Sequence, residues 1–166
     1  MFKQTKTIAT DELKILGRLD NQRLYRYIQK KYVLSNEYID KYKIFITEAN
    51  GIGKLGEALS TPLIGEPFVG ATDTFISIGP FDDKSTTEAV LKYIKTKFAR
   101  TMLGVKKVTQ HNPRSTWSKV PMQNFTSISD IDWSKSVSEI DQQLYRKYGL
   151  TQDEISFIET KVQEMN

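Results

Sequence analysis

An apolar stripe between residues 86 and 103 is the feature that most restricts what this chain can fold into. Its members recur at steps of three and four residues, the spacing that brings side chains to one face of an α-helix. They are Leu91, Ile94, Phe98 and Met102. Gly104 follows the stripe as a stop signal. The pattern predicts one amphipathic helix over residues 86–103, with Met102 filling the core.

The segment 136–166 predicts a pair of helices. Ser136 stands three residues before Glu139, and Thr151 stands three residues before Glu154, which is the spacing of a capping box at a helix start. Apolar residues recur behind each box, and Gly149 lies between the two helices as a stop. Acidic residues occupy their outer positions, so we expect this end to pack or to meet another protein rather than nucleic acid.

The first half of the chain is typical of strands and turns. Residues 43–47 form a β-rich run before Asn50-Gly51, and residues 74–78 alternate well before Gly79-Pro80. Residues 22–34 mix aromatic rings with cations, and their periodicity leaves a strand or a short helix open. We therefore predict an α+β fold: an irregular mixed sheet from about residues 22–80, a central amphipathic helix and a C-terminal helical pair.

Composition narrows the class of protein. The chain has 166 residues, 39% hydrophobic and 27% charged, which predicts one domain over residues 1–166, with 1–21 as a flexible or incomplete segment. It has no cysteine, which excludes disulfides, thiolate zinc sites and cysteine nucleophiles. No apolar run reaches the roughly 20 residues needed to span a bilayer. The N-terminus lacks an apolar signal core, so we expect a cytoplasmic protein without membrane contact.

The positive charge is concentrated in the middle of the sequence. Residues 1–85 carry 12 basic and 11 acidic side chains, residues 86–119 carry 8 and 1, and residues 120–166 carry 4 and 8. A local excess of cations is typical of a surface that binds a polyanion, although such runs are often only solvated.

Residues 106–119 combine four cations with amides, hydroxyls, the only histidine and a tryptophan, and include no acid. Cations bind phosphates, Asn and Gln can hydrogen-bond base edges, and an aromatic ring can stack on a base. We expect the cations of this stretch and of the preceding helix to neutralise phosphates: Lys92, Lys97, Arg100, Lys106, Lys107, Arg114 and Lys119. Candidates for the base edges are Gln110, His111, Asn112 and Arg114, with Trp117 packing or stacking.

Three catalytic or cofactor interpretations are weaker. Residues 51–56 satisfy the glycine pattern of dinucleotide sites, but Pro62 leaves no room for the helix that must follow. A glycine turn is the better interpretation, and its Lys54 could meet a phosphate. Glu12-Leu13-Lys14 has the Glu-X-Lys pattern of metal-dependent nucleases, but no strand-borne aspartate stands at a suitable distance before it. A lone histidine cannot form a two-histidine metal site, so a hydrogen bond suits His111 better than catalysis.

Tyrosines between residues 25 and 42 are a further candidate for base stacking. They lie beside Arg23, Arg26, Lys30 and Lys31. We expect at least half of them to pack in the core, because aromatic side chains dominate protein interiors. The set is Tyr25, Tyr27, Tyr32 and Tyr42.

Several blocks of this sequence resemble the C-terminal region of adenine-specific DNA methyltransferases of bacterial restriction–modification systems. In chain order, they are residues 45–53, 59–67, 91–98, 107–111, 129–136 and 145–150. The resemblance runs from about residue 40 to the end. It implies a target recognition domain, which holds DNA and reads its sequence while another domain transfers the methyl group.

The catalytic motif of that family, Asn/Asp-Pro-Pro-Tyr/Phe, is absent, and Asn112-Pro113-Arg114 does not match it. The resemblance therefore implies the specificity part alone, with no cofactor in this chain and S-adenosylmethionine in an associated catalytic domain. The expected partners are double-stranded DNA and a methyltransferase or endonuclease subunit. The alternatives are a metal-dependent restriction endonuclease acting by itself, and an interaction module whose C-terminal helices dock onto a catalytic subunit.

Overall fold

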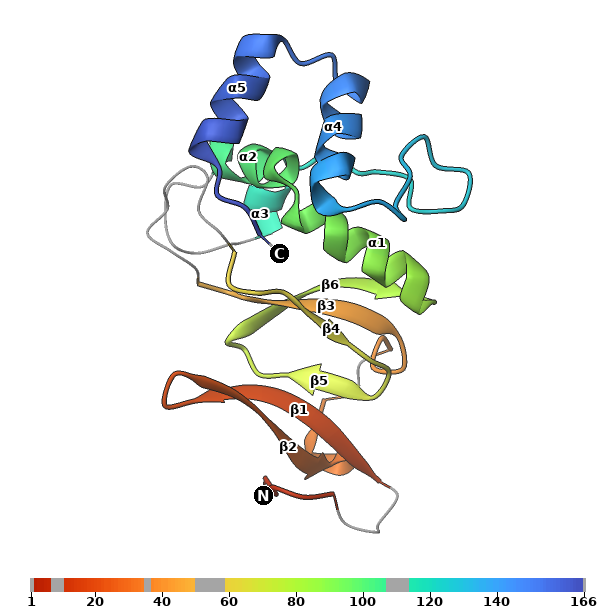
Figure 1. Ribbon diagram of the computed structural model, residues 1–166. Coiled ribbons are helices and arrows are strands. Elements are labelled where there is room, and N and C mark those ends of the chain that lie inside the picture. The colour runs from red at the N-terminus through yellow and green to blue at the C-terminus, as the bar shows by residue number, and fades with distance from the viewer. Residues whose placement is uncertain (1, 7–10, 35–36, 50–58, 107–113, 166) are drawn as a thin grey trace. The chain divides into compact units, whose positions relative to one another are not determined.

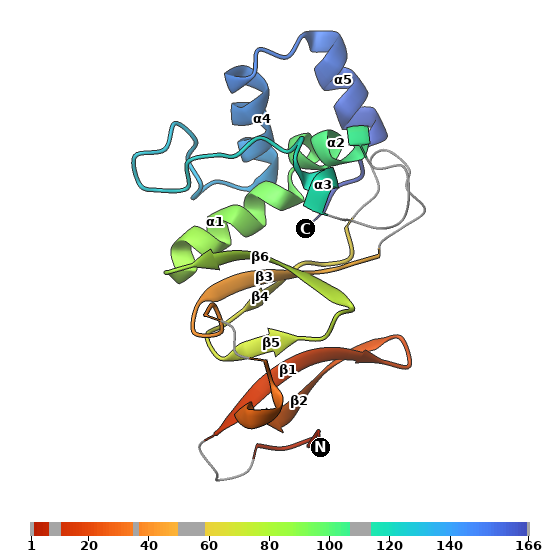
Figure 2. The same ribbon diagram turned by 180° about the vertical axis from the view of Figure 1, so that it is seen from behind.

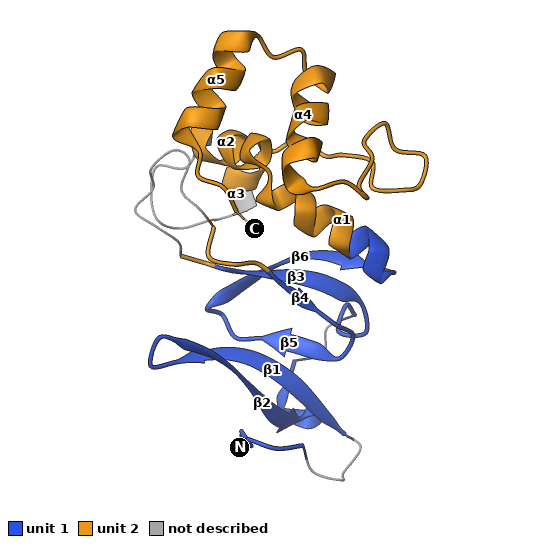
Figure 3. Ribbon diagram, viewed as in Figure 1, with its two compact units in different colours: residues 1–47, 63–87 blue, residues 48–62, 88–166 orange. Residues whose placement is uncertain are grey.

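The computed structural model describes residues 2–6, 11–34, 37–49, 59–106 and 114–165 (Figure 1). Within these ranges it combines five α-helices with two small sheets, which confirms the predicted α+β class. The chain divides into two compact units, one of residues 1–47 and 63–87 and the other of residues 48–62 and 88–166 (Figure 3). Every strand of the structure belongs to the first unit, and helices dominate the second.

The first sheet has the order β2-β1-β5 and contains β1 (Glu12–Leu19), β2 (Gln22–Gln29) and β5 (Val69–Ala71). β1 pairs antiparallel with β2 and parallel with β5. Asp20 and Asn21 join β1 to β2, and their positive φ angles of 48° and 62° suit a two-residue hairpin turn. After β2, one 3-10 turn (Lys30–Tyr32) completes the segment that the sequence left open between strand and helix.

β1 corrects the expectation that residues 1–21 form a flexible or incomplete segment, because its eight residues are the centre of this sheet. Side chains on both of its faces are buried: Leu13 and Ile15 pack with Ile28, whereas Leu16 packs with Phe45. A strand buried on both faces lacks the polar–apolar alternation of a half-exposed strand. The sequence pattern therefore does not reveal it.

The second sheet has the order β4-β3-β6 and is antiparallel throughout. Its central strand β3 (Tyr42–Thr47) confirms the run at residues 43–47, and β4 (Leu63–Gly65) is short. β6 (Phe75–Phe81) continues through Gly79 and Pro80, where the sequence predicted a stop. A buried cluster of Leu16, Phe45, Val69 and Phe75 joins residues of both sheets in the core of the first unit.

The predicted helix over residues 86–103 is two helices, α1 (Lys84–Lys95) and α2 (Lys97–Lys106), visible in Figure 2. The break at Thr96 has a visible cause. Its hydroxyl donates to the carbonyl oxygen of Tyr93 at 2.6 Å, and the carboxylate of Asp141 accepts from the amides of Lys97 and Phe98 at 2.9 Å each. A side-chain acceptor satisfies the free N–H groups that begin a helix, so Asp141 stabilises a new start after Thr96.

The C-terminal helical pair is confirmed as α4 (Val137–Lys147) and α5 (Gln152–Lys161), after the short helix α3 (Arg114–Trp117). Both predicted capping boxes form, with Ser136 and Thr151 accepting from the amides of Glu139 and Glu154. Gly149 follows α4 with a φ of +63°, the left-handed conformation that glycine adopts at helix ends. The apolar faces are buried at Ile140, Leu144, Ile158 and Val162.

Candidate nucleic-acid interface

One face of the β1–β2 hairpin combines cations with aromatic rings. The antiparallel register places Lys14 opposite Tyr27, Leu16 opposite Tyr25, and Arg18 opposite Arg23. Alternate residues of a strand share a face, so these side chains stand on the same side of the sheet. We call Lys14, Arg18, Arg23, Tyr25 and Tyr27 the hairpin face. Arg18 is exposed, and the other four are partly buried.

Two arginines stand opposite each other on the hairpin face. Arg18 and Arg23 are direct cross-strand partners, and like charges in that position destabilise a sheet. Burial lowers the pKa of the Arg23 guanidinium, and the charge of Arg18 lowers it further. A phosphate within reach of both guanidinium groups would accept charge-assisted hydrogen bonds from each of them.

Aromatic rings lie close to two cations of the hairpin face. The Lys14 ammonium lies 4.2 Å from the centre of the Tyr25 ring, and the Arg23 guanidinium lies 5.9 Å from the Phe75 ring. Tyr25 also packs against the buried cluster that contains Leu16 and Phe45, and burial raises the pKa of its hydroxyl. Tyr25 therefore belongs partly to the core and partly to the surface.

The other candidate tyrosines are also accessible. Tyr27 and Tyr42 are partly buried, and Tyr32 is exposed with the Lys31 ammonium 5.0 Å from its ring centre. Three of the four tyrosines are partly buried, Tyr25 among them against a core cluster, and none is fully buried. The rings that frame the cations of this hairpin are therefore available for contact.

The net charge around the hairpin is hidden when the first half of the chain is counted as one segment. Residues 12–32 carry six cations and two acids, yet residues 1–85 taken together are nearly neutral. Glu12, one of the two acids, is fully buried at its side chain and bonded to the Lys3 ammonium at 2.8 Å. A charge count restricted to the hairpin and the 3-10 turn after it finds this excess.

Three of the predicted phosphate contacts have partners inside the second unit. The Lys92 ammonium donates to the carbonyl oxygens of three consecutive residues, at 2.9, 3.1 and 2.9 Å. Lys97 forms an ion pair with Glu159 at 2.5 Å. Arg100 is only 3% exposed; its Nε donates to Lys95 and Thr96, and a terminal nitrogen donates to the carbonyl oxygen of Gln163. In this structure these three cations bind partners within the unit; Arg100 is buried, whereas Lys92 and Lys97 are partly exposed.

The remaining predicted contacts are described only in part. Lys54, Lys107, Gln110, His111 and Asn112 lie outside the described residues. For two more, only the helical backbone is described: Lys106 ends α2 and Arg114 begins α3. Trp117 is partly buried, and its indole N–H has no acceptor among the described residues. Lys119 is exposed. The predicted base-reading residues therefore stay a prediction.

The described residues were also compared with the requirements of a metal-dependent nuclease and of a membrane-spanning helix. Glu12 of the Glu-X-Lys triplet is buried and paired with Lys3, so it is occupied in a structural contact. Across the described ranges, no three His, Cys, Asp or Glu side chains gather in a way that could hold a metal ion. No helix in these ranges has both the length and the apolar character to cross a membrane.

Comparison with protein-family models, with curated proteins and with solved structures finds no match to this chain.

Proposed function

We propose that this chain is a DNA-binding target recognition domain of a restriction–modification enzyme, which positions DNA for methylation or cleavage carried out by another domain or subunit. The observation that carries the proposal is the arginine pair of the hairpin face. Arg18 and Arg23 stand directly opposite each other, on the same face as Lys14 and two tyrosine rings. Two guanidinium groups on one face can both donate charge-assisted hydrogen bonds to a phosphate backbone, the polyanion that this pair suits best.

The chemistry of the hairpin face suits nucleic acid better than a small anion. Its cations follow one strand pair for several residues, so they match a charged chain rather than one point charge. Its rings and guanidinium groups offer flat surfaces for sugars and bases. The resemblance of residues 40–166 to recognition domains supports double-stranded DNA and a restriction–modification system as the setting.

A binding assay on variants tests the proposal. A fluorescein-labelled duplex of mixed sequence is titrated with the wild type, with Arg18→Ala/Arg23→Ala, and with Arg146→Ala/Lys161→Ala. The last variant removes two exposed cations of α4 and α5 and changes the net charge equally. We expect the hairpin variant to lose at least tenfold in affinity and the control to lose less than twofold. Equal losses of DNA affinity in the two variants would show that the hairpin face is only a solvated surface.

The restriction–modification setting needs a separate test. Selection of bound duplexes from a random-sequence pool should yield one short recurring site, because a recognition domain discriminates between base pairs. Copurification with a methyltransferase subunit, lost on deletion of residues 136–166, would support the docking of the helical pair. Magnesium-dependent cleavage of plasmid DNA that a single carboxylate substitution abolishes would instead establish the nuclease alternative.

A further inference from the structure

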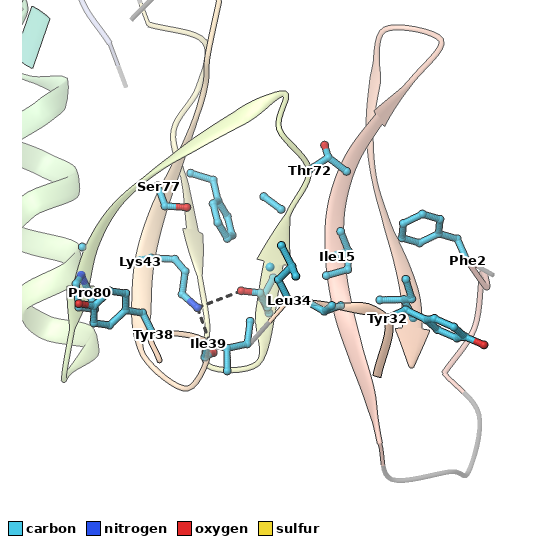
Figure 4. Close-up of a pocket in the computed structure, with 17 residues that line it drawn as sticks. Phe2, Ile15, Tyr32, Leu34, Tyr38, Ile39, Lys43, Thr72, Ser77 and Pro80 are labelled. Atoms are coloured by element: carbon cyan, nitrogen blue, oxygen red, sulfur yellow. Dashed lines mark hydrogen bonds between the residues drawn. The ribbon is translucent and has the colours of Figure 1, made fainter. Parts of the chain in front are cut away.

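The first unit contains a cavity of about 500 Å³ with a buried lysine in its wall. This volume lies within the roughly 300–1,000 Å³ typical of small-molecule sites. Strands of both sheets line it, mostly with apolar side chains such as Ile15, Phe45 and Val69. Figure 4 shows the Lys43 side chain running into this space from β3. The cavity lies apart from the cations of the hairpin face, none of which lines it.

Lys43 is held inside the unit by specific packing. The residue is 7% exposed, and Gly65 is its cross-strand partner on β4. A Cβ atom at Gly65 would lie 3.0 Å from the Lys43 stem and 2.3 Å from the Phe45 ring. The glycine therefore leaves the room that lets a lysine stem and an aromatic ring share this part of the core.

The ammonium of Lys43 has an incomplete set of partners. It donates to the carbonyl oxygens of Ile39 and Val69, both at 3.1 Å, and an ammonium group has three hydrogens to donate. In the part of the chain that the structure describes, no carboxylate forms an ion pair with it. Burial lowers the pKa of Lys43, and the more distant charge of Asp40 opposes that change only in part. A buried cation without a counter-ion is costly, and a bound anion relieves the cost.

We propose that this cavity binds a small amphipathic carboxylate. One carboxylate oxygen accepts the third hydrogen of the Lys43 ammonium, and the apolar body of the ligand fills the space beside Ile15, Ile39 and Val69. The single cation favours one carboxylate over a phosphate, which needs more donors. Large apolar side chains around the cavity are exposed to the extent of 47–93%, so a ligand would cover apolar surface there. They are Phe2, Tyr32, Leu34 and Tyr38.

The test compares a carboxylate with an uncharged molecule of the same chain length. Sodium octanoate and 1-octanol are titrated into the whole protein, and binding is followed by calorimetry and by the methyl resonances of Ile15, Ile39 and Val69. A hydrogen bond from an ammonium to a carboxylate is stronger than one to a neutral hydroxyl, so octanoate should bind the wild type at least tenfold more tightly than octanol. Both titrations should move those methyl resonances.

Variants separate a ligand site from a purely structural lysine. Lys43→Met keeps the stem and should abolish the preference for octanoate. Lys41→Met is the matched control, because Lys41 is outside the cavity and pairs with Asp82 at 2.7 Å. The control should keep the preference. If Lys43→Met does not fold, the wild-type titrations still decide. Equal affinities for the two probes, binding elsewhere, or no binding would show that Lys43 only joins two backbone carbonyls.

Discussion

Lys92 is predicted from the sequence to bind a phosphate of DNA, whereas in the structure its ammonium forms hydrogen bonds within the protein. Its ammonium converges on the carbonyl oxygens of Trp133, Ser134 and Lys135. These hydrogen bonds connect α1 to the segment that carries Trp133. Lys92→Met keeps the length and apolar character of the side chain and removes all three bonds. If the structure describes the role of Lys92, this variant loses stability and keeps its contacts with DNA.

The size of the loss follows from the surroundings of the three bonds. The bond to Trp133 is partly buried, whereas those to Ser134 and Lys135 are exposed. A charged hydrogen bond shielded from water contributes about 1.5–3 kcal/mol. Exposed polar contacts contribute only about 0.5 kcal/mol each, because water replaces them. We therefore expect Lys92→Met to lower the unfolding free energy of the second unit by about 3 kcal/mol.

Tryptophan fluorescence isolates this unit, because both tryptophans of the chain, Trp117 and Trp133, belong to it. Urea unfolding followed by tryptophan emission should give the loss directly, and DNA titrations should show an unchanged salt dependence. Lys161→Met, at an exposed cation of α5, is the control and should stay within about 0.5 kcal/mol of the wild type. If Lys92→Met is as stable as the wild type and its DNA affinity depends less on salt, Lys92 contacts DNA and its structural role is refuted.

Three further predictions concern the stability of the two units. Burial raises the pKa of Asp141 to about 6 from 3.8 in the unfolded chain, so its ionisation lowers stability as the pH rises from 4 to 7. Over that range, the wild type should lose about 3 kcal/mol of unfolding free energy relative to Asp141→Asn in tryptophan-monitored unfolding. A stability difference between the two proteins that does not change with pH would contradict the effect of burial. Ser136→Ala removes a helix cap and should cost about 1 kcal/mol in the same assay, with Ser156→Ala, within α5, as the control. Gly65→Ala forces a Cβ to 2.3 Å from the buried Phe45 ring and should accelerate hydrogen exchange in β3, whereas Gly17→Ala, with its nearest contact at 3.6 Å, should not.

The sequence predicts best where structure depends on neighbouring residues. The capping boxes at Ser136 and Thr151 and the glycine stop at Gly149 involve residues a few positions apart, and all three form as expected. The strand at residues 43–47 is also correct, because its β-branched and aromatic run is local. These signals suffice for the α+β class.

The sequence-based predictions differ from the structure where an element depends on contacts between residues far apart in the sequence. The break between α1 and α2 depends on Asp141, more than 40 positions away, which no helical periodicity can include. β1 is hidden because it is buried on both faces, a consequence of its central place in the sheet. Lys92, Lys97 and Arg100 also have intramolecular partners far along the chain, and their contact with DNA stays a prediction.

The candidate site also depends on contacts between residues that are far apart in the sequence. Charge counting finds an excess of cations but not their partners, so it favoured residues 86–119 over the hairpin. Pairing Arg18 with Arg23 required the register of β1 and β2, which the sequence does not supply. Lys43 was part of a predicted strand, and its burial beside a cavity follows only from the packing of the two sheets.

The salt dependence of DNA affinity tests the proposed function most directly. Each phosphate contact contributes about 0.9 to the slope of log affinity against log salt concentration. With about five contacts, the wild-type slope should be about −4 to −5, and Arg18→Ala/Arg23→Ala should reduce its magnitude by about 2. Anisotropy titrations of one duplex from 50 to 300 mM salt measure both slopes. A wild-type affinity that hardly changes over this range, or a hairpin variant with the wild-type slope, would contradict the proposal that this protein holds DNA through the hairpin face.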